Sequence, residues 1–220
     1  MAGEGFECND QYLCLPTIDH VRVGGRIDGG GVVMARFART REERHGQTPI
    51  IRGQISSLRS MLAAPLIDDV GGALATNMIT GFALELSLKL FYMTFNEEAP
   101  PATHNLNDLW HGLPEDWRAE ISREYAGDAR SKAEIVLIAL QRAPSAPSPP
   151  AAHDAPKLGS ADGFFKTMSE AFTYARYFYE KVEVGEWAHI VSAPNHFLAM
   201  IDVLASFYEH RLTEAAKLKT

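Results

Sequence analysis

Hydrophobic residues occupy most positions between residues 82 and 95, so a helix formed there would be apolar on nearly all of its faces. Such a helix is normally buried at the centre of a domain. Glu85 and Lys89 interrupt the stretch, four residues apart and in the order that favours an ion pair across one helical turn. Because an isolated buried charge is strongly destabilising, we expect these two side chains to be paired with each other or with groups on a neighbouring helix.

Helical spacing of apolar residues also characterises the chain before this stretch. A first helix is predicted from about Gln54, and a second from Pro65 to Phe95. Glycines within the second, such as Gly81, either weaken it locally or allow another helix to pack closely against it. Two consecutive prolines at residues 100–101 end this region.

Shorter elements are predicted next. Thr103 or Asn105 can cap a short helix that Gly112 closes, and Pro114 opens another. Residues 129–142 are predicted to form a further helix. Two long amphipathic helices complete the chain, and the second starts near Pro194. The apolar stripe of the first consists of Phe165, Met168, Phe172, Ala175, Tyr179 and Val182. The stripe of the second consists of Phe197, Ile201, Leu204, Tyr208 and Arg211.

The segments outside these patterns have different compositions. Residues 1–50 combine short alternating apolar runs with glycine turns, which indicates a non-helical arm or a β-hairpin. Residues 143–160 form a proline-rich loop. The prediction is therefore an all-α fold: an N-terminal arm over residues 1–50, followed over residues 54–217 by an up-and-down bundle of four to five helices that this loop interrupts.

Composition and charge exclude several classes of protein. The net charge of −7 argues against a surface that binds nucleic acid everywhere, although arginines concentrate over residues 36–59. The candidates for nucleic-acid contact are Arg36, Arg39, Arg41 and Arg44. With only two cysteines, Cys8 and Cys14, a disulfide scaffold and a cysteine zinc quartet are both excluded. The polar interruptions of the apolar region predict no membrane segment, and we expect a cytoplasmic protein.

Three short motifs carry a resemblance to a known family: Glu-Leu-Ser-Leu-Lys at 85–89, His-Asn-Leu at 104–106, and Ala-Arg-Tyr-Phe-Tyr-Glu at 175–180. In this order and spacing they resemble HEPN-type helical domains, over roughly residues 55–215. The resemblance implies a helical bundle that is commonly a homodimer and is often found in bacterial defence, toxin–antitoxin and nucleotide- or RNA-associated systems.

Catalytic members of that family are metal-independent RNases with an arginine and a histidine separated by four to six intervening residues near the start of the last long helix. Here no histidine occurs after Arg176 until His189, and the only matching spacing, Arg39 to His45, lies in the arm. We therefore expect a binding or interaction module rather than an enzyme. A metal-independent endoribonuclease of toxin type is the alternative.

The polar residues of the bundle are the candidates for a site. They form either a structural network between helices or a small pocket for a nucleotide phosphate or another anion, and they are Glu85, Lys89, His104, Asn105, Arg176, Tyr177 and Glu180. His104 can act as a general base or hydrogen-bond a helix end. The spacing of the histidines predicts no metal site, and no cofactor is expected.

Self-association is the expected partnership, with a second protein, RNA or a nucleotide as further candidates. The last two helices carry more aromatic residues than one bundle face needs, namely Tyr174, Tyr177, Phe178 and Phe207. Exposed aromatic residues are enriched at protein interfaces. These four are therefore predicted to line a homodimer surface.

Overall fold

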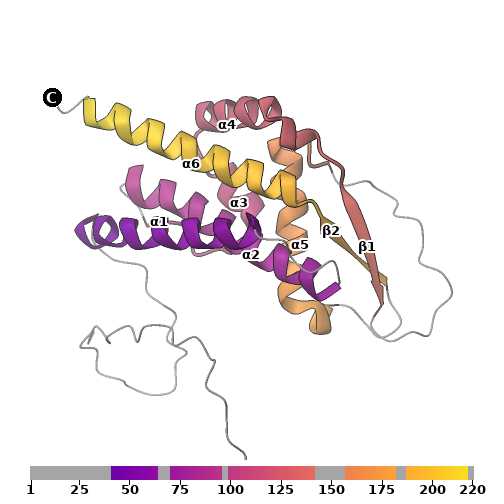
Figure 1. Ribbon diagram of the computed structural model, residues 1–220. Coiled ribbons are helices and arrows are strands. Elements are labelled where there is room, and N and C mark those ends of the chain that lie inside the picture. The colour runs from indigo at the N-terminus through magenta and orange to yellow at the C-terminus, as the bar shows by residue number, and fades with distance from the viewer. Residues whose placement is uncertain (1–40, 64–69, 96–98, 142–156, 182–186, 218–220) are drawn as a thin grey trace, which may run out of the picture. The chain divides into compact units, whose positions relative to one another are not determined.

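In the computed structural model, the chain is described over residues 41–63, 70–95, 99–141, 157–181 and 187–217. These residues form six α-helices, one short 3₁₀ helix and a single pair of strands. The predicted all-α, helical-bundle class is confirmed. The predicted arm up to residue 40 and most of the proline-rich loop lie outside the described residues (Figure 1).

Helix α2 (Val70–Phe95) forms the centre of the bundle, as the apolar pattern predicted. Leu84, Leu88 and Phe91 are almost completely buried. The Phe91 ring lies 5.7 Å from that of Phe207, between ring centroids, which joins α2 to the C-terminal helix. By length and composition alone, Gly71–Phe95 would also suit a membrane span, but 67% of its most apolar window is buried inside the bundle. Core helices of soluble proteins have the same character.

Helix α1 (Arg41–Ala63) begins earlier than the predicted start at Gln54 and continues through Pro49. Residues 41–50, which the sequence placed in the arm, are therefore helical. Their composition is polar and includes a glycine and a proline, so the local pattern carries little helical signal. The helix is held by its core side instead, where Ile55 and Leu62 are buried, and packing of one face commonly overrides weak propensity.

Helix α5 (Ala161–Lys181) packs closely on α2 at Gly81. A Cβ atom added there would lie 2.3 Å from the Phe172 side chain, so only glycine permits this approach. Of the two roles that the sequence left open for Gly81, close helix packing is the one observed.

The short helices α3 (Leu106–His111) and α4 (Glu115–Gly127) lie where the capping residues predicted them. The Asn105 side chain caps α3 by accepting hydrogen bonds from the backbone N–H groups of Asn107 at 2.9 Å and Asp108 at 3.1 Å. Gly112 comes directly after the last residue of α3, and Pro114 precedes α4.

The predicted helix over residues 129–142 is wrong. A 3₁₀ helix, η1 (Ala129–Lys132), is followed by strand β1 (Val136–Gln141), which pairs antiparallel with β2 (Trp187–Ser192). A short apolar run with β-branched residues fits either a buried helix segment or a strand. This run forms a strand because it pairs with β2, which lies about fifty residues later in the chain.

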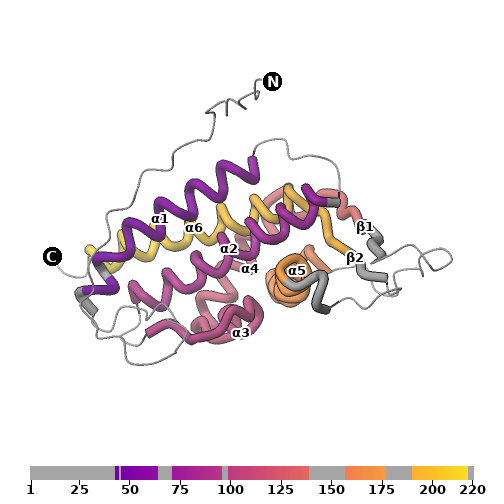
Figure 2. The backbone as a smooth tube through the Cα atoms, turned by 90° about the horizontal axis from the view of Figure 1, so that it is seen from below, coloured from indigo at the N-terminus to yellow at the C-terminus, as the bar shows by residue number. Residues whose placement is uncertain are grey.

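Helix α6 (Pro194–Lys217) begins at the predicted proline, and its stripe of Phe197, Ile201, Leu204 and Tyr208 is buried. Phe207 is also buried, with only 1% of its surface exposed, so its predicted place on an exposed dimer surface is wrong. Its ring packs instead against Phe91 of α2 and Trp117 of α4. Both views of the backbone show α1 beside α6, with the β1–β2 pair at one end of the bundle (Figures 1 and 2).

Candidate functional site

The acid and base within α2 form a buried ion pair. Lys89 Nζ donates a hydrogen bond of 2.7 Å to Glu85 Oε1, and the two side chains are 3% and 7% exposed. The pairing that the four-residue spacing predicted is therefore confirmed. One helical turn brings both groups together without help from another element.

His104 completes this cluster from outside α2. Its Nδ1 atom lies 2.9 Å from the same Glu85 Oε1, while 65% of the His104 side chain is exposed. The other oxygen, Glu85 Oε2, is buried and has no hydrogen-bond partner within the described part of the chain. The carboxylate thus orients an exposed imidazole from below. We use the name α2 cluster for Glu85, Lys89 and His104.

The remaining predicted site residues have contacts with other groups, or their side chains lie outside the described part of the chain. Asn105 caps α3 and also accepts a hydrogen bond of 2.9 Å from Ser169 Oγ on α5. The Arg176 guanidinium lies over the rings of Phe82 and Phe172, at 5.7 and 5.3 Å from their centroids. Nothing is described for the side chains of Tyr177 and Glu180. Their predicted contacts with Glu85 and Lys89 therefore stay predictions.

The predicted nucleic-acid contacts receive little support from the described part of the chain. Arg36, Arg39 and the side chain of Arg41 lie outside it. Arg44 is only 4% exposed. A guanidinium buried to this degree is poorly placed to reach a phosphate backbone, so its burial does not favour the predicted contact, which stays a prediction.

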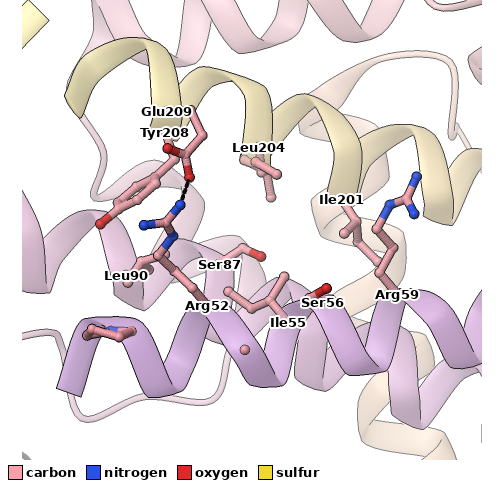
Figure 3. Close-up of a pocket in the computed structure, with 13 residues that line it drawn as sticks. Arg52, Ile55, Ser56, Arg59, Ser87, Leu90, Ile201, Leu204, Tyr208 and Glu209 are labelled. Carbon is pink, nitrogen blue, oxygen red and sulfur yellow. Dashed lines mark hydrogen bonds and ion pairs between the residues drawn. The ribbon is translucent and has the colours of Figure 1, made fainter. Parts of the chain in front are cut away.

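The described residues form a groove between α1 and α6, which the sequence did not predict. It has a volume of about 470 Å³, within the range of small-molecule sites. Residues of α2 form its floor, and α1 and α6 form its walls (Figure 3). The lining consists of Pro49, Arg52, Gly53, Ile55, Ser56, Arg59, Ser87, Leu90, Ile201, Leu204, Ala205, Tyr208 and Glu209.

One end of the groove is closed by a single ion pair. Arg52 Nη2 of α1 donates to Glu209 Oε1 of α6, and the two side chains are 47% and 53% exposed. The Arg52 guanidinium also lies 5.9 Å from the centroid of the Tyr208 ring. In Figure 3 this arginine reaches across from α1 toward α6 beside Tyr208.

Arg59 lines the other end of the groove and belongs to a group of four charged residues. Arg59 donates through Nε and Nη2 to the two carboxylate oxygens of Asp202, the second bond measuring 3.1 Å. Arg130 of η1 donates to the same carboxylate at 2.8 Å and is itself bound to Asp128 at 2.7 Å. We call these four residues the arginine–aspartate network.

The pKa values within this network show how tightly it is coupled. Burial by itself raises the pKa of Asp202, but the hydrogen bonds from Arg59 and Arg130 outweigh it and leave the pKa below its ordinary value. The hydrogen bond from Arg130 likewise lowers the pKa of Asp128. The hydrogen bond to Asp202 raises the pKa of Arg59. All four groups are therefore held in their charged forms at neutral pH.

A sequence signal for the groove does exist. Arg52 and Arg59 are seven residues apart on α1, and Asp202 and Glu209 are seven residues apart on α6. Seven residues are about two helical turns, so each pair lies on one face of its helix. Two antiparallel helices can therefore form both ion pairs in one register, but only knowledge that α1 and α6 are neighbours makes the match meaningful.

Comparisons with known proteins do not extend this picture. No protein-family model matches the chain, and no similar curated protein or solved structure is found. The resemblance to HEPN domains therefore stays a prediction. Among the residues that the structure describes, no three His, Cys, Asp or Glu side chains are grouped in a way that could hold a metal ion.

Proposed function

We propose that this chain is a HEPN-like helical-bundle binding module that takes a small, largely apolar ligand in the groove between α1 and α6. The observation that carries the proposal is the groove itself: a concave surface of ligand size with an apolar middle and charged groups confined to its ends. Ligand sites typically combine apolar walls with a few placed polar groups.

The way α1 is attached explains why the groove remains open. The two ion pairs join α1 to α6 at points about two helical turns apart, and Ile55, Leu90 and Leu204 face the space between the helices. Well-packed protein interiors leave few voids larger than a water molecule. An opening of about 470 Å³ above apolar side chains is thus a place where a ligand gains contacts that the protein does not supply itself.

Among the described residues that line the groove there is no histidine and no cysteine, which are the commonest general base and the strongest ordinary nucleophile. Its two arginines are engaged with carboxylates. These groups suit recognition and orientation of a ligand rather than bond breaking. The module is therefore proposed to bind in the groove without catalysis there.

The test is saturable binding of a neutral apolar reporter, such as N-phenyl-1-naphthylamine, followed by its fluorescence. Ala205→Trp places an indole in the groove and should abolish binding, because Ala205 lines it. Ser206→Trp is the matched control: Ser206 is also exposed on α6 but does not line the groove, so binding should persist. Equal binding by both variants would refute the proposed site.

A second candidate function is supported by the α2 cluster. A buried carboxylate that orients an exposed imidazole is the arrangement of a general base, as metal-independent RNA cleavage requires. If His104 acts in this way, cleavage of RNA in the presence of a chelator is lost in His104→Ala. The control is His210→Ala, since His210 is another exposed histidine beside a carboxylate, at 3.4 Å from Glu214. Absence of cleavage by the unaltered protein would rule this function out.

A further inference from the structure

The two arginines of the groove differ in how many of their N–H donors are used in hydrogen bonds to a carboxylate. Arg52 makes one hydrogen bond, through Nη2, to a carboxylate that is itself 53% exposed. Arg59 uses two donors on Asp202, whose side chain is only 24% exposed. A guanidinium has five N–H donors, so most of those on Arg52 remain available for another acceptor.

The two carboxylates differ in how well each would tolerate the loss of its arginine. Glu209 is half-exposed and would be hydrated, and ion pairs between such exposed groups contribute little to stability. Asp202 is more buried and forms part of a network with Arg130 and Asp128. Withdrawal of Arg59 would disturb three elements at once, since the network joins α1, η1 and α6.

The Tyr208 ring helps to position the Arg52 guanidinium. It lies beside the Arg52 guanidinium, 5.9 Å from centroid to Cζ, and its hydroxyl is engaged with Thr94 Oγ1 at 2.8 Å. The ring is therefore held in place independently of Glu209, and a cation–π contact keeps Arg52 at the groove when its carboxylate partner changes. Arg52 can therefore exchange its carboxylate partner while the Tyr208 ring holds its guanidinium at the groove.

We infer that the groove ligand is an amphipathic carboxylate and that Arg52 receives its head group in exchange for Glu209. This inference rests on the proposed function of the groove. A carboxylate can accept two parallel hydrogen bonds from the planar fork of a guanidinium, and it is the same group as the Glu209 carboxylate that it replaces. The apolar tail lies over Leu90, Ile55 and Leu204 toward Arg59, along a length of roughly 10 Å, the rise of seven helical residues.

The experiment compares decanoate with decanol, which share a tail and differ in charge, by calorimetric titration below the concentration at which either aggregates. The unaltered protein should bind decanoate about tenfold more tightly than decanol, which is the preference expected from one hydrogen-bonded charge pair. Arg52→Gln should remove this preference. Arg59→Gln should retain the preference, because Arg52 is still present to receive the carboxylate.

A second variant keeps the inference falsifiable if either arginine variant folds poorly. Glu209→Gln removes the competing carboxylate, so it should increase the preference for decanoate over decanol. A preference that survives Arg52→Gln, or that disappears only in Arg59→Gln, would overturn the assignment of Arg52. Equal affinity of the unaltered protein for both ligands would overturn the anionic ligand class while leaving the groove as an apolar site. If neither ligand nor the neutral reporter binds, the proposed function fails as well.

Discussion

The α2 cluster and the ends of the groove use the same chemistry in different surroundings. Lys89 and Glu85 pair at 2.7 Å with 3% and 7% of their side chains exposed. Arg52 and Glu209 pair with about half of each side chain in water. A buried pair cannot exchange its partners, because the released charge has no water to solvate it, whereas an exposed pair can. Burial thus separates a structural ion pair from one that is available to a ligand.

The arginine–aspartate network lies between these extremes. Its side chains are 21–46% exposed, but each carboxylate receives more than one hydrogen bond from an arginine. The larger number of hydrogen bonds holds these charged groups in place although they are not fully buried. The network anchors α1 and η1 to α6. At the opposite end of the groove, α1 and α6 are joined by the single ion pair between Arg52 and Glu209, which can be exchanged.

Removing one member of the buried pair should have the largest effect. Lys89→Met leaves the buried Glu85 carboxylate without its lysine partner, and we expect the free energy of unfolding to fall by about 3–5 kcal/mol. Urea denaturation measures this. The double variant Glu85→Leu/Lys89→Met should recover much of the loss, because no buried charge remains. A loss below about 1 kcal/mol for the single variant would show that the pair is not buried in solution.

Packing density should distinguish the contact between α2 and α5 from the groove wall on α1. Gly81→Ala inserts a Cβ atom 2.3 Å from Phe172 and should destabilise the protein by about 1–3 kcal/mol, the usual range for overpacking. Gly53→Ala on α1 meets no atom within 4 Å and should stabilise it by about 0.5–1 kcal/mol through helix propensity. Equal effects of the two substitutions on the thermal midpoint would contradict the difference in packing.

Neutralising the centre of the network should have an intermediate effect. Asp202→Asn removes the acceptor shared by Arg59 and Arg130, and we expect a loss of about 1–2 kcal/mol, since hydrogen bonds to charged groups exceed neutral ones. Chemical denaturation at neutral pH provides the measurement. Asp108→Asn serves as the control, because Asp108 is exposed outside the network and should change stability little.

Acid should weaken the network selectively. The pKa values of Asp202 and Asp128 in the folded protein lie below the ordinary value of 3.8. Their contribution to stability is therefore complete above that value and is lost as pH falls through the lower folded pKa values. Unfolding free energies measured from pH 5 downward should fall less steeply in Asp202→Asn than in the unaltered protein. Parallel pH profiles would show that Asp202 is not held in its charged form by the arginines.

The smallest effect on stability is expected for the exchangeable pair. Arg52→Gln should lower the free energy of unfolding by no more than about 0.5–1 kcal/mol, as for other exposed pairs. High salt should reduce even this difference, because exposed charges are screened. A loss comparable to that of Asp202→Asn would indicate that Arg52 is as firmly held as the network, against the role inferred for it.

Local patterns predicted the parts of this structure that depend on neighbours along the chain. The pairing of Glu85 with Lys89, the cap at Asn105 and the start of α6 at Pro194 each involve residues within about one helical turn. Helix geometry alone brings such residues together. The burial of α2 was also predictable from its composition, because an apolar helix has to be covered.

Contacts between distant segments were decided by the tertiary structure. Strand β1 exists because β2 pairs with it, Phe207 is buried because α2 and α4 lie against it, and the approach of His104 to Glu85 depends on how the chain returns after α2. The groove is the clearest case. The equal spacing of its arginines and acids was present in the sequence. The two ion pairs form only because α1 and α6 both pack on α2, which sets the register between two helices that are about 150 residues apart.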